Sequence, residues 1–196
     1  MRLIVITPET PVTAEAETIM TILDRGVERV HLRHPGLSAD DVAAIIEKID
    51  ARYHYRLSLN DFHELASRYG CGIHLNGRNP RAPEGFDGTV SSSCHSVAEA
   101  SAAAPMTDYR FISPVFDSIS KQGYTAAFTP GELRRAFADG LLDSDTFALG
   151  GVNADNIGRL RDTGFSGAAV LGAAWGDGSL EDISQRINRL LQCCNS

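Results

Sequence analysis

Eight short apolar segments recur along this chain, and about seven helical patterns separate them. The predicted strands cover residues 3–7, 29–33, 56–59, 72–75, 89–92, 108–112, 147–149 and 168–171. Between the fourth and fifth strands, residues 76–88 hold Pro80, Pro83 and three glycines without an apolar period, so we expect a loop in place of the fourth helix. This alternation predicts an α/β fold, a compact (β/α)8 barrel. An open doubly wound sheet is the alternative, although it normally has fewer strands.

Capping residues mark where several helices begin. Ser38 precedes a helix and has an acidic residue three positions later, and Ser96 with Glu99 repeats this spacing. Pro130 stands at a first helical position, and Asp61 can cap the helix that follows the third strand. The last helix covers residues 179–191, and its predicted inward side chains are Leu180, Ile183, Ile187, Leu190 and Leu191.

Size and composition limit the classes of protein to consider. The 196 residues suit a single domain spanning 1–196, and the hydrophobic fraction of 43% is ordinary for a soluble protein. A net charge of −7 argues against a nucleic-acid or anionic-membrane surface. The first apolar run is too short for a signal peptide, no run approaches membrane-spanning length, and the cysteines lack metal-ligand spacing. We therefore expect a cytoplasmic protein. Assembly into a homo-oligomer is possible.

Glycines follow the last two predicted strands. Gly150 and Gly151 come directly after the seventh strand, and a helical pattern capped by Asn153 runs from there to Gly164. Gly172 follows the eighth strand in a turn of small residues. Because glycine has no Cβ, an anion can approach the backbone N–H groups at such positions. This segment predicts a phosphate site, although the two adjacent glycines could serve only to make a tight turn.

Polar side chains follow most of the predicted strands. The candidates are His31, Arg33, Asn60, Asp61, His74, Asn79, Ser93, His95, Ser118, Ser120 and Lys121. In a parallel barrel these positions meet at one mouth. The guanidinium of Arg33 suits two phosphate oxygens, or it could pair internally with Asp61. His31 and His74 could be core histidines, and Lys121 could be a solvated lysine.

The order of several motifs resembles the thiamine phosphate synthase and thiazole tautomerase superfamily over nearly the whole chain. The motifs are HLR at 31–33, LNDFHELA at 59–66, GIHLNGRN at 72–79, SCHSVAEA at 93–100, DYRFISPVFDSISKQG at 108–123, ALGGVNADN at 148–156 and GAAVLGAAW at 167–175. The resemblance implies a transferase that joins hydroxymethylpyrimidine diphosphate to a thiazole phosphate and releases diphosphate.

The resemblance also implies roles for the candidate residues. Arg33, Asn60, Ser93 and Lys121 would hold the diphosphate, with Arg33, Ser93 and Lys121 catalytic. A magnesium ion bridging the diphosphate would lie at the positions of Asp61 and Asn79. The remaining predicted substrate contacts are His31, Ser118, Ser120, Gly150, Gly151 and Gly172, the last three near the thiazole phosphate.

Some residues depart from the synthase pattern. Pro35 replaces a cation, Asn79 stands at the second metal aspartate, and Gly172 replaces a serine. The motifs at 31–33 and 93–96 look more like the tautomerase branch, whereas Pro114 is as in synthases. A thiazole tautomerase that uses His31 or His95 as its base therefore stays open. So does a non-catalytic protein that only binds a thiazole or pyrimidine phosphate.

Overall fold

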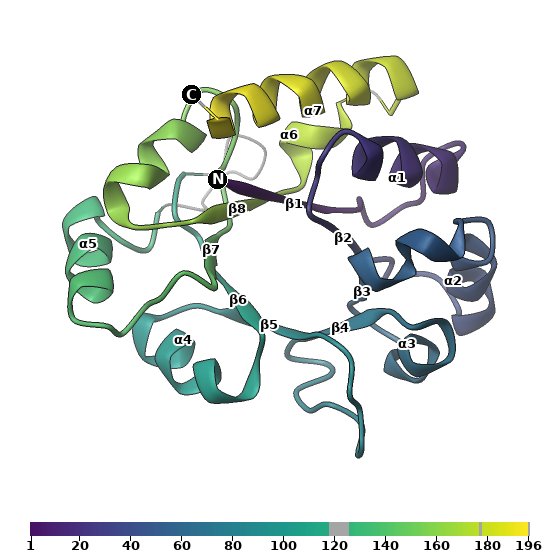
Figure 1. Cartoon of the computed structure of the whole chain (residues 1–196), viewed down its shortest axis with the longest axis horizontal. Helices are drawn as coiled ribbons and strands as arrows, with labels where there is room; N and C mark the ends of the chain where they lie inside the picture. Colours follow the sequence, from purple (N-terminus) through teal and green to yellow (C-terminus); the bar gives the residue numbers. More distant parts are fainter. Residues whose placement is uncertain (118–125, 177, 196) are drawn as a thin grey trace.

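The computed structural model describes residues 1–117, 126–176 and 178–195. Its eight strands are β1 (Arg2–Ile6), β2 (Arg29–Leu32), β3 (Leu57–Leu59), β4 (Gly72–Leu75), β5 (Val90–Cys94), β6 (Tyr109–Ile112), β7 (Thr146–Ala148) and β8 (Gly167–Val170). Neighbouring strands are parallel in sequence order, and β1 pairs with β8 to close the barrel (Figure 1). The predicted (β/α)8 barrel is confirmed, and the open sheet is wrong.

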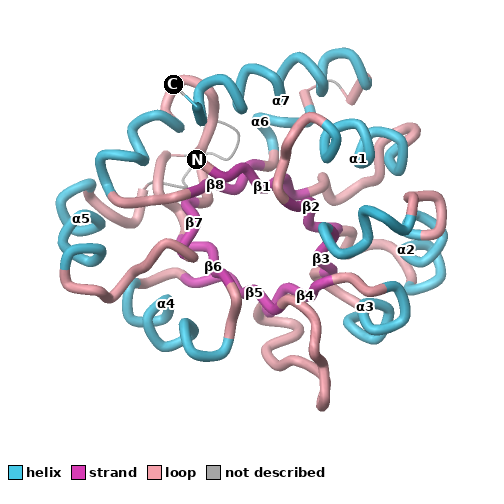
Figure 2. The backbone as a smooth tube through the Cα atoms, in the orientation of Figure 1, coloured by secondary structure: helices cyan, strands magenta, loops and turns pink. Residues whose placement is uncertain are grey.

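Helices surround the ring of strands (Figure 2). They are α1 (Glu15–Asp24), α2 (Ala39–Ile46), α3 (His63–Tyr69), α4 (Val97–Ala103), α5 (Pro130–Ala138), α6 (Gly172–Trp175) and α7 (Leu180–Asn195), with 3-10 helices η1 (Ala51–Arg56), η2 (Ala104–Met106) and η3 (Ile157–Thr163). The fully described segment 76–89 contains no helix, which confirms the predicted loop between β4 and β5.

Side-chain caps begin the helices α2, α4 and α5. Ser38 forms the reciprocal capping box with Asp41, and the helix α5 begins at Pro130 as predicted. Ser96 accepts a hydrogen bond from the backbone N–H of Glu99 at 3.1 Å. The carboxylate of Glu99, however, accepts from the N–H of His95, so only half of the predicted box forms.

Predictions about the two helices that follow β7 and β8 are partly corrected. The helix after β7 is the 3-10 helix η3, and its N-cap position is Asn156. The Asn153 side chain accepts instead from the N–H of Asp155 at 2.8 Å. The predicted end at Gly164 is correct, with φ at 106°. The final helix α7 continues to Asn195, and Leu180 at its start is exposed rather than inward.

The barrel interior is only partly apolar. Its hydrophobic cluster consists of Ile4, Ile6, Tyr109, Phe111, Phe147 and Ala169. Three buried polar side chains, His31, Ser58 and His74, come from neighbouring strands. Barrel interiors are usually filled by branched apolar residues. These polar groups therefore mark the interior beneath the strand ends as a place where chemistry could be supported.

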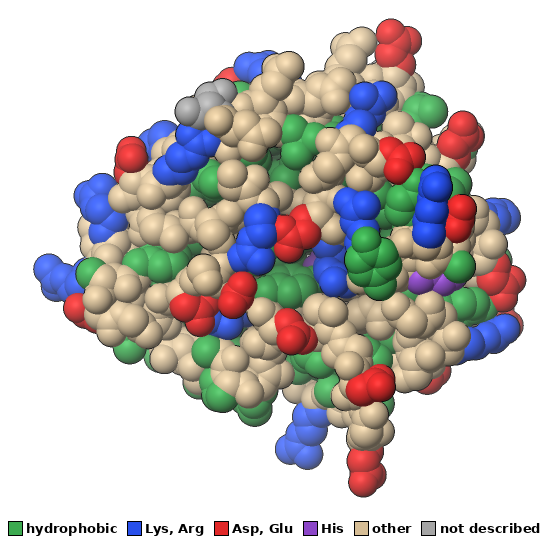
Figure 3. All heavy atoms as spheres, viewed as in Figure 1, with side chains coloured by type: hydrophobic (Ala, Val, Ile, Leu, Met, Phe, Trp, Pro, Cys, Tyr) green, Lys and Arg blue, Asp and Glu red, His purple; other side chains and the backbone are tan. Residues whose placement is uncertain are grey.

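Charges of both signs lie intermixed around the middle of the face seen in Figure 3. In the described part of the chain, helix α7 and the shorter helices all fall short of the length and apolar character needed to cross a membrane.

Candidate functional site

A cavity of about 940 Å³ opens at the ends of the strands. It is lined by residues near or just after the ends of all eight strands, among them Ile6, Arg33, Asn60, His74, Ser93, His95, Phe111, Leu149 and Leu171. It continues outward past the loop that replaces the fourth helix, where Arg78 and Arg81 line it. The structure therefore brings the predicted residues Arg33, Asn60, His74 and Ser93 to one mouth. Their contacts with a substrate stay predictions.

His31 lies beneath this mouth. Its Nε2 is 2.6 Å from the hydroxyl of Tyr109, which in turn lies 3.1 Å from the hydroxyl of Ser58. Its Nδ1 has no hydrogen-bond partner among the described residues, although the ring is fully buried. Burial, with a smaller contribution from His74, lowers the pKa of His31 well below its ordinary value. The imidazole is therefore neutral near pH 7, and its predicted contact with substrate stays a prediction.

His74 joins the interior to the cavity. Its Nδ1 is 2.9 Å from the hydroxyl of Ser91, and its Nε2 is 2.8 Å from the hydroxyl of Ser93. Burial lowers the pKa of His74 to about 3. A neutral imidazole has one N–H donor and one acceptor nitrogen, so it fixes the orientation of both serine hydroxyls. His74 thus positions Ser93, one of the predicted diphosphate ligands.

Arg33 directly follows β2 at the rim of the cavity. Its backbone N–H donates to Thr7 Oγ1 at 2.9 Å, which ties the end of β2 to the end of β1. Its guanidinium is 2.8 Å from the carboxylate of Glu9, so the alternative pairing with Asp61 is not the one observed. The next residue, His34, is buried against Glu15 at 2.7 Å. These contacts hold Arg33 at the mouth with its charge balanced by a carboxylate.

Asp61 does not cap α3, because the N-cap position is Phe62 and no side chain bonds the helix end. Instead, its carboxylate accepts from the Arg78 guanidinium, at 3.0 Å to Oδ1 and 2.9 Å to Oδ2. The Asn79 amide nitrogen donates to the same Oδ1 at 3.0 Å. The carboxylate is therefore surrounded by N–H donors from the loop between β4 and β5.

These surroundings test the predicted magnesium position. Magnesium in proteins prefers carboxylate and other oxygen ligands in an octahedral arrangement. Magnesium usually needs only one or two protein carboxylates beside waters and phosphate oxygens, so the contacts of Asp61 and Asn79 decide whether it fits. Asn79 presents its amide nitrogen to Asp61, and Arg78 holds both carboxylate oxygens. This set of donors does not fit a magnesium ion held by Asp61 and Asn79.

The glycines after β7 make a close backbone contact. Gly150 and Gly151 have φ of 91° and 67°, conformations that favour glycine. The backbone N–H of Phe116 donates to the carbonyl of Gly150 at 3.0 Å, and the Asn156 side chain donates to the carbonyl of Gly151 at 2.8 Å. Among the described residues, the N–H of Gly151 has no hydrogen-bond acceptor. The loop can therefore offer a backbone donor to an anion.

Gly172 lies at the start of the short helix α6, where a turn was predicted. A Cβ added at Gly172 would meet no atom within 4 Å, so packing does not require glycine there. The Trp175 indole N–H donates to the carbonyl of Ile6 at 2.7 Å and anchors this helix to β1. Ser118, Ser120 and Lys121 lie outside the described residues, and their predicted roles stay predictions.

Sequence reasoning missed two features of this site, Arg78 and the interior contact of Tyr109. Arg78 stands beside Asn79 in a proline-rich loop, and a cation next to a predicted metal position is the signal that could have indicated it. Tyr109 lies two positions from Phe111 in the same strand, so both share the inward face. That alternation could have placed a hydroxyl within the barrel.

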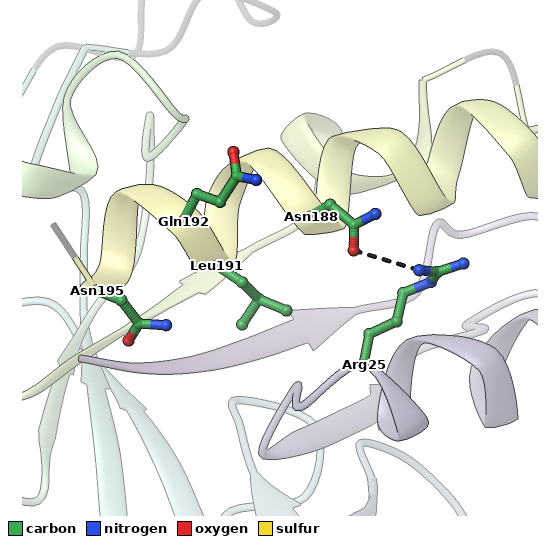
Figure 4. Close-up of a pocket in the computed structure, with 5 residues that line it drawn as sticks. All are labelled: Arg25, Asn188, Leu191, Gln192 and Asn195. Carbon is green, nitrogen blue, oxygen red and sulfur yellow. Dashed lines mark hydrogen bonds between the residues drawn. The ribbon is translucent and has the colours of Figure 1, made fainter.

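A second hollow lies away from the mouth, between the end of α1 and helix α7 (Figure 4). Its volume is about 470 Å³, and its lining is Arg25, Asn188, Leu191, Gln192 and Asn195. Arg25 donates to the Asn188 side chain at 3.3 Å. The lining of this second hollow includes none of the predicted site residues.

The closed barrel with polar side chains at its mouth places the chain among the compact (β/α)8 barrels. A solved thiamine phosphate pyrophosphorylase from Bacteroides thetaiotaomicron is 34% identical, with a TM-score of 0.88 over 100% of this chain and 98% of that chain. The sequence model described as thiamine monophosphate synthase matches residues 3–174, and the chain therefore belongs to that family.

Two further comparisons extend this assignment. A thiamine-phosphate synthase from Serratia proteamaculans is 32% identical over 180 residues, which cover 83% of this chain and 81% of the relative. A thiamine phosphate pyrophosphorylase from Pyrococcus furiosus, at 20% identity, has a TM-score of 0.79 over 99% of this chain and 95% of that chain. This last similarity supports the fold alone.

Proposed function

We infer that the chain is a thiamine-phosphate synthase, a transferase that joins hydroxymethylpyrimidine diphosphate to thiazole phosphate. The observation that carries this inference is the family match over residues 3–174. The cavity at the strand ends supports it, because Arg33, Asn60 and Ser93 place donors at one mouth, as a phosphorylated substrate needs. Cytoplasmic location, a homo-oligomer and the absence of nucleic-acid or membrane partners stay predictions.

The proposed reaction breaks one bond and forms another. The carbon–oxygen bond of the pyrimidine diphosphate breaks, the diphosphate leaves with the electron pair, and a pyrimidine cation remains. The thiazole nitrogen then supplies the electron pair of the new carbon–nitrogen bond. Because charge develops on the leaving diphosphate, donors fixed around its oxygens accelerate the first step.

The residues at the mouth divide between the two substrates. Arg33, Asn60, Ser93 and Lys121 would hold the diphosphate, and His74 would orient the hydroxyl of Ser93 from below. The side chains of Ser118 and Ser120 would contact the thiazole, and the backbone of Gly150, Gly151 and Gly172 would face its phosphate. A bridging magnesium ion, if used, would need oxygen ligands beyond Asp61 and Asn79.

The direct test is to incubate the purified protein with both phosphorylated substrates and follow thiamine phosphate by chromatography. We expect product and diphosphate in equal amounts, both with magnesium and in a parallel reaction without it. No product at high enzyme concentration under either condition would reject the synthase assignment.

A thiazole tautomerase is the second candidate, because His95 lines the cavity and its Nδ1 lies 3.3 Å from the carbonyl of Ser113. An imidazole at the mouth could serve as the base for proton transfer. Interconversion of thiazole phosphate isomers in the presence of a chelator, without thiamine phosphate formation, would favour this candidate. Thermal stabilisation by either substrate without any turnover would indicate a binding protein.

Replacing Lys121 by alanine is expected to reduce the rate of thiamine phosphate formation. Losing one charge-assisted contact at a site of developing charge costs about 2–4 kcal/mol, or roughly 30- to 1000-fold in rate. The measurement is kcat/KM for the pyrimidine diphosphate at saturating thiazole phosphate. An unchanged value would remove Lys121 from the site.

A further inference from the structure

Arg78, in the loop between β4 and β5, lies between two neighbouring cavities. It lines the mouth cavity together with Arg33 and Asn60, and it also lines an adjoining hollow of about 530 Å³ with Asp61. Its side chain is 55% exposed, so a ligand can reach the guanidinium without opening the core. Arg78 is therefore a cation accessible from the cavity that receives the diphosphate in the proposed reaction.

Local hydrogen bonds fix the position of this loop. The Asn76 side chain accepts from the backbone N–H of Arg78 at 2.9 Å and of Asn79 at 3.1 Å. The Asn76 amide also donates to the carbonyl of Asn60 at 2.6 Å. Because Asn60 directly follows β3, the loop is held to the strand end beside a predicted diphosphate ligand. Arg78 therefore needs little ordering before it binds an anion.

Both arginines at the mouth are paired with a carboxylate. Arg33 Nη1 lies 2.8 Å from one oxygen of Glu9, and Arg78 contacts both oxygens of Asp61. A guanidinium that binds a carboxylate in this way presents the same donors to two oxygens of a phosphate. Each carboxylate therefore occupies donors that a diphosphate could use.

The charge of Arg78 also bears on the magnesium prediction. A cation beside the leaving diphosphate is needed to offset its developing charge, and the N–H donors of Arg78 and Asn79 around Asp61 do not fit magnesium. The guanidinium of Arg78 already lies against that carboxylate. We propose that Arg78, with Arg33, binds the diphosphate of the substrate directly and supplies there the positive charge otherwise expected from a metal ion. This rests on the proposed synthase function.

The test is isothermal titration of the full-length protein with inorganic pyrophosphate in the presence of a chelator. We expect binding without metal, and less than a twofold change in affinity when magnesium replaces the chelator. Arg78→Gln should weaken binding at least tenfold, and Arg78→Lys should weaken it less, because lysine keeps the charge but loses the planar fork. The control is Arg68→Gln on α3, which breaks an exposed pair with Glu47 and should leave the affinity unchanged.

The pyrophosphate affinity of Asp61→Asn distinguishes a diphosphate ligand at Arg78 from a metal ligand at Asp61. If Arg78 is the diphosphate ligand, this variant releases the guanidinium and keeps or increases the affinity for pyrophosphate. If Asp61 is a metal ligand, the variant abolishes binding that depends on magnesium. Pyrophosphate binding only with magnesium and lost in Asp61→Asn, or equal affinities of Arg78→Gln and the wild type, would overturn the proposal.

The binding assay tests the role of Arg78, and the turnover assay tests the synthase function, so either claim can be rejected without the other. Thiamine phosphate formation together with metal-dependent pyrophosphate binding would keep the synthase function and reject the role of Arg78. Pyrophosphate binding through Arg78 without thiamine phosphate formation would keep the anion site and reject the synthase function.

Discussion

Replacing Gly151 by alanine is expected to destabilise the protein by about 3–5 kcal/mol and to abolish most of its activity. The left-handed φ of 67° is unfavourable for alanine, and the new Cβ would lie 2.6 Å from the carbonyl oxygen of Phe116 and against that of Asp117. Backbone atoms cannot rotate away as a flexible side chain can. The loop after β7 would have to move, and with it the proposed phosphate donors. Urea unfolding and kcat/KM for thiazole phosphate measure the two effects.

Gly158→Ala is the matched control for stability. Gly158 lies in the 3-10 helix η3 that follows the same loop, and a Cβ there would meet no atom within 4 Å. We expect its unfolding free energy to lie within about 1 kcal/mol of the wild type. If Gly151→Ala unfolded at the same urea concentration as Gly158→Ala, the close backbone contact would not be important for stability.

The strands could be predicted from sequence because each combines a short apolar run with a nearby turn signal. The absence of the fourth helix could also be predicted from the sequence, since Pro80 and Pro83 exclude a regular helix between β4 and β5. These features depend on local sequence, and the barrel then follows from the order of the elements.

Asp61 shows what local sequence could not predict. Its spacing from the start of α3 fits a helix cap, but the carboxylate bonds Arg78, which is 17 residues away in sequence. Arg33 likewise pairs with Glu9 from the preceding loop rather than with Asp61. Both outcomes depend on how two loops fold against each other. Periodicity and capping rules do not contain that information.

The two interior histidines should make the protein sensitive to mild acid. Burial lowers the pKa of His74 to about 3 and the pKa of His31 well below its ordinary value of 6.5. Below pH 6.5 the unfolded chain therefore binds protons that the folded protein cannot, so stability falls as pH falls. Each histidine contributes at most about 1.4 kcal/mol per pH unit, a slope that is reached only well below pH 6.5. Urea unfolding at steps between pH 7 and 5 measures this loss.

His74→Gln separates the histidines from other acid-sensitive groups. Hydrogen bonds at the helix caps lower the carboxyl pKa of Asp41 and Glu132 from ordinary values of 3.8 and 4.5. These carboxylates therefore take up protons mainly below pH 5, outside the range of the measurement. Glutamine can still bond Ser91 and Ser93 but does not titrate, so the loss of stability between pH 7 and 5 should fall by about 1 kcal/mol per pH unit. The same pH dependence in the variant and the wild type would show that His74 is not the buried neutral group argued here. Acid sensitivity would then have to come from His31 or from the buried His63, whose pKa burial also lowers.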